Sequence, residues 1–258
     1  RTENGGLIVG LAGERIINSF RFYAVFQENE EYTVRWNSQE LGTIVQPPPI
    51  GEKIAIAGHV WVIEDIDHKR HVVYCEQIKG KVPAYFGECP GDIHTKILER
   101  MRQVLREDTQ YPYLMAHAAA RLQQARHAAR SSGVTEHTLI CLGGDMWCLF
   151  PWMGTYAFLA LERLLKVRCA GSLKLSGLSA SRPYFIQFKM QADRETFFRV
   201  LQEEARRPLD SMELVYPKEL PLFEKYDEFL PESLVRKGFA YGVLAVEEMK
   251  ACIQQWNR

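Results

Sequence analysis

Side chains that can carry positive charge gather in residues 67–71 (DHKRH), a polar turn between two predicted strands. Lys69 and Arg70 lie at its tip, and Lys79 and Lys81 follow further along the chain. Lysine and arginine at the rim of a small barrel can supply the phosphate contacts on which nucleic-acid affinity largely depends. The turn therefore indicates either a phosphate-contacting rim or an ordinary solvated hairpin tip.

Trp61 is the aromatic side chain nearest to this turn on the preceding predicted strand. It alternates with Val60 and Val62, so its indole lies on the opposite face of the strand from these valines. Single-strand binding proteins stack bases on such side chains, but a tryptophan can equally fill the interior of a barrel. The sequence leaves both roles open, with packing slightly favoured.

Two further arginines, Arg126 and Arg130, share one face of an alanine-rich predicted helix because they are four residues apart. They form either a narrow basic stripe or part of a plain solvent-exposed face. The segment FPWMGT, residues 150–155, joins a predicted strand to a predicted helix. Backbone amides at that helix start can receive a phosphate, although a buried turn explains the segment equally well.

Sequence signatures of catalysis are missing from the chain. A phosphate-binding loop needs GxxxxGK[ST], and neither this pattern nor a DExD/H box nor HExxH occurs. The six cysteines show no CxxC spacing, which structural zinc sites normally need. We therefore expect no catalytic centre and no metal or other cofactor in this chain, and reduced thiols at Cys75, Cys89, Cys141, Cys148, Cys169 and Cys252.

Charge and hydropathy limit the partners of the chain. Among its 258 residues, 32 lysines and arginines balance 32 acidic residues, so any contact with nucleic acid must come from a local patch. The apolar runs are short, which predicts no membrane span and a cytoplasmic location. The chain begins at Arg1 with a glycine-rich segment, so we expect a piece of a larger protein with a linker over residues 1–19.

The elements that must position these residues begin with a run of short strands. Apolar and polar residues alternate from Phe20 to Phe26 and again from Tyr32 to Trp36, which predicts a hairpin. Further strands are predicted at residues 41–45, 53–57, 59–66 and 71–77. So many short strands at close spacing predict an antiparallel meander that curls into a small β-barrel-like domain over residues 20–90.

After the glycines near residue 90 the apolar period becomes helical. Two long helices are predicted, one over residues 93–105 with Asp92 as its cap and one from Pro112 to about Ser131, ending at Gly133. Strands and helices then alternate at residues 138–142, 146–150, 155–166, 184–190 and 194–206, before a loop-rich part and a last helix near Trp256. The predicted fold is α+β, with residues 91–258 forming a helical connection and an α/β domain.

Several motifs follow one another along the chain: FRFYAVF, EYTVRW, ELGTIVQPPPIGEKIAIAGHVWVIEDIDHKRHVVYCE, GDIHTKILERMRQVL and GGDMWCLFPWMGTYAFLALERLL. In this order they resemble the region beyond the motor in large helicase-related DEAD/DEAH-box helicases. The likeness covers residues 20–166 and is weaker after Gly171. It implies a parent helicase whose motor lobes and winged helix lie upstream and use ATP and magnesium.

The resemblance also implies a role for this chain as an accessory region that contacts and guides a single strand of DNA or RNA. The residues proposed for that contact, Trp61, Lys69, Arg70, Lys79, Lys81, Arg126 and Arg130, come from residue chemistry and not from the family. One alternative is a protein–protein interaction module, which an exposed apolar patch would mark. Another is an unrecognised nucleic-acid-processing enzyme, which needs a closed pocket with perturbed acids or a Cys/His pair.

Overall fold

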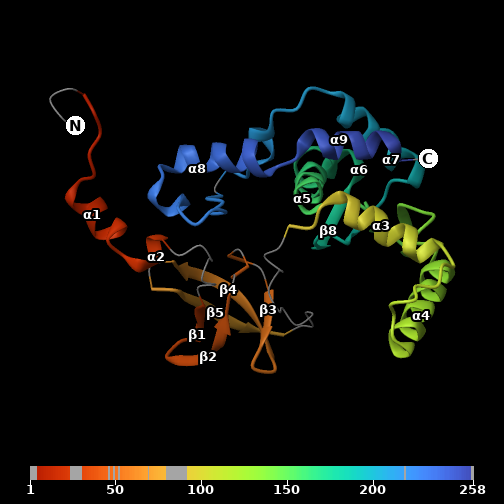
Figure 1. Cartoon of the computed structure of the whole chain (residues 1–258), viewed down its shortest axis with the longest axis horizontal. Helices are drawn as coiled ribbons and strands as arrows, with labels where there is room; N and C mark the ends of the chain where they lie inside the picture. The colour runs from red at the N-terminus through yellow and green to blue at the C-terminus, as the bar shows by residue number, and fades with distance from the viewer. Residues whose placement is uncertain are drawn as a thin grey trace. The chain divides into compact units, whose positions relative to one another are not determined.

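The computed structural model describes residues 5–23, 31–45, 47–48, 50–51, 53–68, 70–79, 92–217 and 219–256. The chain has a mixed α+β fold and divides into two compact units, Arg1–Cys89 and Pro90–Arg258. Figure 1 labels the elements along the chain. Each unit has its own sheet and its own buried apolar cluster, so each is considered separately below.

The first unit is built on a curled five-stranded sheet of order β2-β1-β5-β4-β3 (Figure 1). Its strands are β1 (Tyr32–Trp36), β2 (Gln39–Ile44), β3 (Lys53–Ile56), β4 (His59–Asp67) and β5 (Val72–Ile78). The register shifts between Val34 and Arg35 and between Ile63 and Asp65, and such bulges increase the twist of a sheet.

The curl brings the two edge strands of this sheet together. A Cβ at Gly42 in β2 would lie 3.1 Å from Cδ1 of Ile56 in β3, so a side chain at this position would crowd the other edge. The strands predicted at residues 32–36, 41–45, 53–57, 59–66 and 71–77 are confirmed to within two residues at each end, and the sheet is a half-barrel. The expected all-antiparallel meander is wrong, because β1 pairs with β5 in parallel.

The first predicted strand is also wrong where the structure describes it. Phe20–Tyr23 forms the short helix α2 after α1 (Leu11–Ile17), while residues 24–30 lie outside the described part. Phe20 and Tyr23 are exposed. The alternation of Phe20 and Phe22 therefore marks no buried sheet face, and a period of two specifies a strand only where one face is buried.

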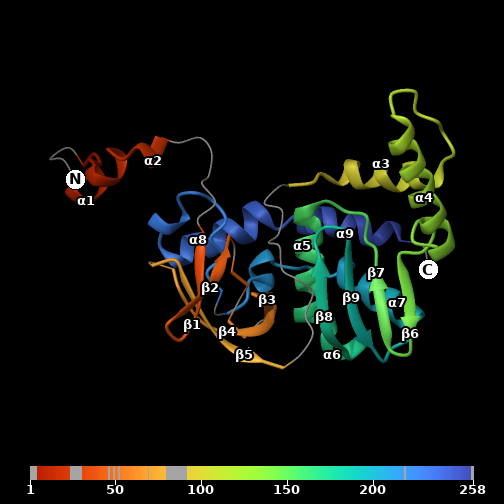
Figure 2. The same cartoon turned by 90° about the horizontal axis from the view of Figure 1, so that it is seen from below.

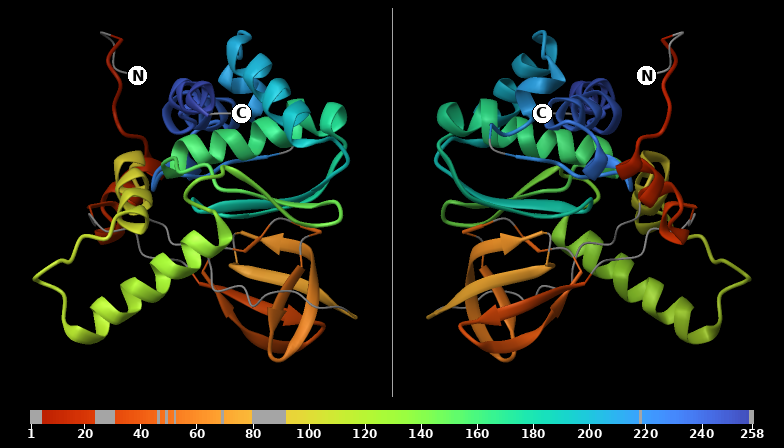
Figure 3. Two further views of the ribbon diagram at one scale, coloured as in Figure 1. Left: turned by 90° about the vertical axis from the view of Figure 1, so that its right-hand side faces the viewer. Right: turned by 90° about the vertical axis from the view of Figure 1, so that its left-hand side faces the viewer.

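The second unit has a four-stranded antiparallel sheet of order β6-β7-β9-β8 (Figure 2). Its strands are β6 (Leu139–Gly143), β7 (Met146–Leu149), β8 (Leu175–Ser181) and β9 (Phe185–Met190). Because the sheet is antiparallel and the helices of residues 155–173, 194–206 and 246–255 gather on one face, the unit is of the α+β type and not the predicted α/β type (Figure 3).

Helices supply most of the core of the second unit. α5 (Thr155–Leu164) continues through the π-helical turn Leu165–Cys169 into α6 (Ala170–Leu173), and α7 (Arg194–Arg206) has the predicted bounds. The loop-rich end holds 3-10 turns at Ser211–Leu214 and Asp227–Phe229, α8 (Glu232–Gly238), a π-helical turn at Phe239–Val243 and α9 (Val246–Gln255). Leu149, Ile186 and Phe188 point from the sheet into the cluster that these helices bury.

The two long helices are confirmed as α3 (Thr95–Arg106) and α4 (Ala116–Ser132), with shifted starts. His94, and not Asp92, caps α3, because its Nδ1 accepts a hydrogen bond from the backbone N–H of Lys96 at 3.1 Å. α4 ends as predicted at Gly133, whose φ of 70° is the left-handed conformation that glycine adopts readily. On α3, Leu98 is buried, whereas Ile97 is 59% exposed.

Candidate nucleic-acid interface

Trp61 lies in the core of the first unit and not on its surface. Its side chain is only 2% exposed, and its ring centroid is 5.5 Å from that of Trp36. The indole N–H donates a hydrogen bond to the backbone carbonyl oxygen of Ile56 at 2.9 Å, which satisfies the polar atom of the ring. Of the two roles that the sequence left open, this geometry favours packing, and we no longer assign a base contact to Trp61.

The predicted cationic rim is only partly described, and its described members are separated. Arg70 is exposed, and its Nε lies 3.8 Å from Oδ2 of Asp67 in an exposed ion pair of the kind that contributes little to stability. Lys79 is exposed at the other end of the seven-residue strand β5, roughly 20 Å away. Lys69 and Lys81 lie outside the described residues, so Arg70 and Lys79 alone do not form one patch.

The prediction that Arg126 contacts a phosphate is wrong. This side chain is 1% exposed, its Nε donates to the backbone oxygen of Val104 at 2.9 Å, and its Nη2 donates to that of Thr109 at 3.1 Å. The guanidinium also lies over the ring of Tyr111 and thereby ties α4 to the end of α3. Arg130 is exposed but pairs with Asp108, so the predicted basic stripe does not form.

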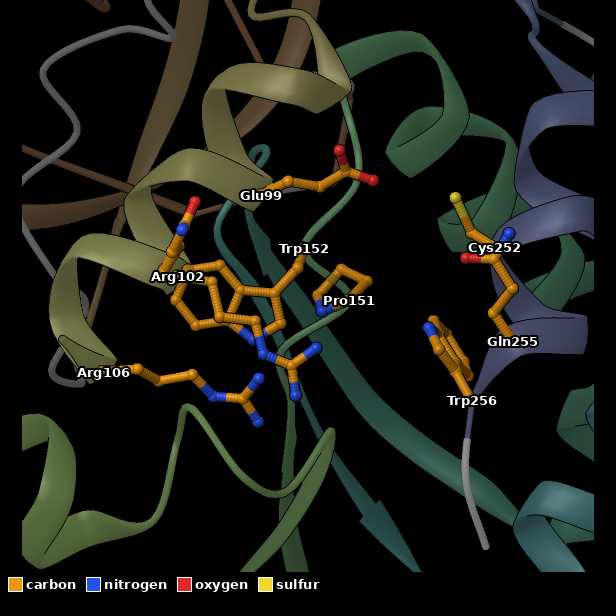
Figure 4. A pocket seen from close by; sticks show the side chains of 9 residues that line it. Glu99, Arg102, Arg106, Pro151, Trp152, Cys252, Gln255 and Trp256 are labelled. Atoms are coloured by element: carbon orange, nitrogen blue, oxygen red, sulfur yellow. The ribbon is translucent and has the colours of Figure 1, made fainter.

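A cleft in the second unit combines cationic and aromatic side chains that the sequence did not single out. Its volume is about 240 Å³. α3 forms one wall, α9 the opposite wall, and the loop after β7 the floor between them (Figure 4). We call it the arginine–tryptophan cleft; its lining residues are Glu99, Arg102, Gln103, Arg106, Pro151, Trp152, Cys252, Gln255 and Trp256.

Trp152 is held in the cleft by an unusual backbone conformation. Its φ is 54°, which is rare for a bulky residue and persists only where surrounding contacts enforce it. One such contact is at Gly154, where a Cβ would lie 2.8 Å from the backbone oxygen of Ile93 and 2.8 Å from the backbone nitrogen of Thr95. The indole N–H donates to the carbonyl oxygen of Val134 at 3.3 Å, so both the backbone and the ring of Trp152 are held in place.

Arg102 has donors to offer to a ligand. Its Nε donates to the carbonyl oxygen of Thr135 at 2.7 Å, and its guanidinium lies over the Trp152 ring, 5.8 Å from the centroid. Within the described part of the chain its Nη1 and Nη2 form no hydrogen bond. Burial, and then repulsion from Arg106, lowers the pKa of Arg102, and the charge of a bound anion would offset both effects.

The cleft has opposite charges at its two ends. The guanidinium groups of Arg102 and Arg106 lie at one end and the Glu99 carboxylate at the other (Figure 4). Arg106 forms a bidentate pair with Glu136, with Nε–Oε1 and Nη2–Oε2 distances of 3.1 and 2.9 Å. Since these side chains are 44% and 60% exposed, solvent screens the pair, and a phosphate can compete for Arg106.

The described residues of this cleft offer neither an activated thiol nor a metal-binding group. Burial, followed by the charges of Glu248 and Glu99, raises the pKa of the Cys252 thiol to about 11, which leaves it protonated at neutral pH. Among the described residues, no group of three His, Cys, Asp or Glu side chains could hold a metal ion. The arrangement is suited to binding an anion that carries a flat ring.

Two of the amides at the start of α5 already have hydrogen-bond partners within the chain. The N–H of Gly154 donates to the Thr95 hydroxyl oxygen at 2.7 Å, and that of Thr155 donates to the carbonyl oxygen of Ile93 at 3.0 Å. Ile93 in turn donates to the Thr155 hydroxyl oxygen at 2.9 Å. These hydrogen bonds and the burial of Pro151, Met153 and Gly154 favour the buried-turn interpretation of residues 150–155, in which the turn positions Trp152.

The sequence contained one signal for the cleft. Arg102 and Arg106 have the same spacing of four on a helix as Arg126 and Arg130, and FPWMG was already recognised as a strand-to-helix turn. No helix in the described ranges has the length and apolar character needed to cross a bilayer. In comparisons with known protein families, curated proteins and solved structures, no match to the chain was found.

Proposed function

We propose that this chain is an accessory region of an ATP-dependent helicase and that it contacts one strand of DNA or RNA through the arginine–tryptophan cleft. The observation that carries the proposal is the Arg102 guanidinium, which is fixed against Trp152 while its Nη atoms bind no described residue. Arginine donors with an adjacent aromatic face are what sequence-independent binders of single strands use. The resemblance of residues 20–166 to large helicase-related proteins supports the same assignment.

In this proposal the ATP chemistry belongs to upstream motor domains and not to this chain. The sequence has no loop to cradle phosphates and no DExD/H box to hold magnesium. The chain adds contacts to a strand that the motor moves, which would increase processivity.

The test is a titration of the chain with a fluorescently labelled single strand at several salt concentrations. Removing one phosphate contact in Arg102→Ala should weaken binding and lower the slope of log K against log salt by about 0.7. Arg199→Ala is the matched control, because Arg199 is exposed on α7 and its ion pair within the described ranges is with Glu203. Equal affinities and equal slopes for all three proteins would count against the cleft as the contact.

A protein–protein interaction module is the second candidate, because the second unit also exposes apolar side chains. They lie between residues 220 and 241, among them Leu220, Leu222, Phe229, Leu230, Leu234 and Tyr241. A contiguous exposed apolar patch marks a contact surface more often than a lone apolar residue does. If the titration finds no saturable binding of any strand, this candidate becomes the better one.

A further inference from the structure

We propose that the arginine–tryptophan cleft is a subsite for one nucleotide: an unstacked base lies against Trp152 while its neighbouring phosphate binds Nη1 and Nη2 of Arg102. This inference rests on the proposed function and makes it specific. It distinguishes a pocket that takes a base from a surface that only follows the phosphate backbone.

The size of the cleft favours one unit of a polymer. Its volume of about 240 Å³ is below the roughly 300–1,000 Å³ of sites that enclose a whole small molecule. A ligand larger than the cleft must therefore leave part of its mass outside. A strand that inserts a single base meets this condition, whereas paired bases in a duplex cannot enter without leaving the stack.

The chemistry of the walls favours an aromatic ring with an adjoining anion. A base entering the cleft meets the Trp152 indole and the Arg102 guanidinium plane, and bases stack on both kinds of surface. Buried Pro151 and Trp256 provide further apolar wall. Because a positioned ring needs no rearrangement to accept a base, the constrained conformation of Trp152 at φ 54° serves binding directly.

The charges fix the direction in which the nucleotide lies. Its phosphate belongs at the end with Arg102 and Arg106, because the Glu99 carboxylate at the other end repels it (Figure 4). Arg106 joins the contact if the phosphate displaces Glu136, and this exchange is feasible because their ion pair is exposed.

The experiment compares three labelled probes on the wild-type chain: a single strand, the same strand with abasic sites that keep every phosphate, and the matching duplex. We expect the normal strand to bind more tightly than both of the others. Trp152→Asn should weaken binding of the normal strand by about 5-fold to 150-fold, which corresponds to one lost stacked base. It should leave the affinity for the abasic strand unchanged.

Two variants guard against a trivial loss of fold. Asparagine tolerates the left-handed conformation at position 152 better than most residues, and Trp152→Phe keeps a ring and should retain most of the affinity. If neither variant folds, the comparison of normal and abasic strands on the wild-type chain still tests whether the cleft binds a base.

The outcomes separate the two proposals. If normal and abasic strands bind the wild-type chain equally well, or if Trp152→Asn weakens both strands by the same factor, the nucleotide subsite is refuted and the strand-binding function stands. If no strand binds saturably, the proposed function itself fails.

Discussion

Replacing Trp61 tests whether the first unit depends on a buried indole or offers a ring to a ligand. A buried aromatic side chain removes about 150–250 Å² from water, which at about 25 cal/mol per Å² corresponds to an upper estimate of about 4–6 kcal/mol. Trp61 is 2% exposed, so nearly all of this applies. Truncation of such a core residue to alanine costs about 3–5 kcal/mol, and we expect Trp61→Ala to lower the free energy of unfolding of the first unit by about 4 kcal/mol.

The conservative variant separates ring packing from the hydrogen bond. Trp61→Phe keeps much of the contact with Trp36 but loses the donor to the Ile56 carbonyl, and we expect a loss of about 1–3 kcal/mol. Urea denaturation gives both free energies, and hydrogen exchange of the β1–β5 amides assigns the loss to this sheet. The reasoning is refuted if Trp61→Ala leaves the stability of the sheet unchanged while it weakens binding of a labelled single strand.

Three further predictions concern the second unit. Gly154→Ala places a methyl group within 2.8 Å of two backbone atoms, so we expect about 1–3 kcal/mol of destabilisation in thermal unfolding and an altered near-ultraviolet signal from the displaced tryptophan. Burial alone would raise the pKa of Glu162, but the hydrogen bonds and positive charges of Arg182 and Lys166 together outweigh burial and lower it. Because the folded pKa is lowered, ionised Glu162 stabilises the protein above the unfolded pKa of about 4.3, and this stabilisation is lost as the pH falls through the folded pKa. The difference in unfolding free energy between wild type and Glu162→Gln should therefore shrink in acid. A constant difference across that pH range contradicts the lowered pKa. Because burial raises the pKa of Cys148 to about 11, whereas Cys141 is exposed, a disulfide reagent at pH 8 should label Cys141 first, and equal labelling rates would show that Cys148 is not enclosed.

Local patterns predicted the elements that short-range interactions determine. The bounds of α7 follow from the sequence because Asp193 accepts a hydrogen bond from the backbone N–H of Thr196 and an apolar helical face follows it. The β4–β5 hairpin follows from two alternating runs on either side of a polar turn. Each of these signals is complete within about twenty residues of sequence.

Pairings between distant residues could not be predicted in this way. The parallel contact of β1 with β5 joins segments separated by three other strands, and no local pattern encodes it. β8 was missed because its residues, LSGLSAS, are small and polar, and Gly177 within it has a φ of 59°. An edge strand of this kind lacks the β-branched and aromatic residues by which strands are recognised.

The two arginine pairs show what the sequence leaves undetermined about charged residues. Spacing of four places Arg126 with Arg130 on α4 and Arg102 with Arg106 on α3, but it does not say which face is turned inward. The buried apolar residues do: Ala129 lies one turn after Arg126, and Leu98 lies one turn before Arg102.

An arginine next to such a residue is drawn inside, where its guanidinium must find partners. Accessibility then decides the role. Arg126 is 1% exposed and bonds two backbone oxygens of its own chain, so it stabilises the α3–α4 hairpin. Arg102 is fixed by a single carbonyl beside an open cleft and keeps its Nη atoms for a ligand. Arg126→Met should therefore lower the free energy of unfolding but leave the affinity for a single strand unchanged. Arg102→Ala should weaken strand binding but leave the free energy of unfolding unchanged. If both variants change the same quantity, burial does not separate the two roles.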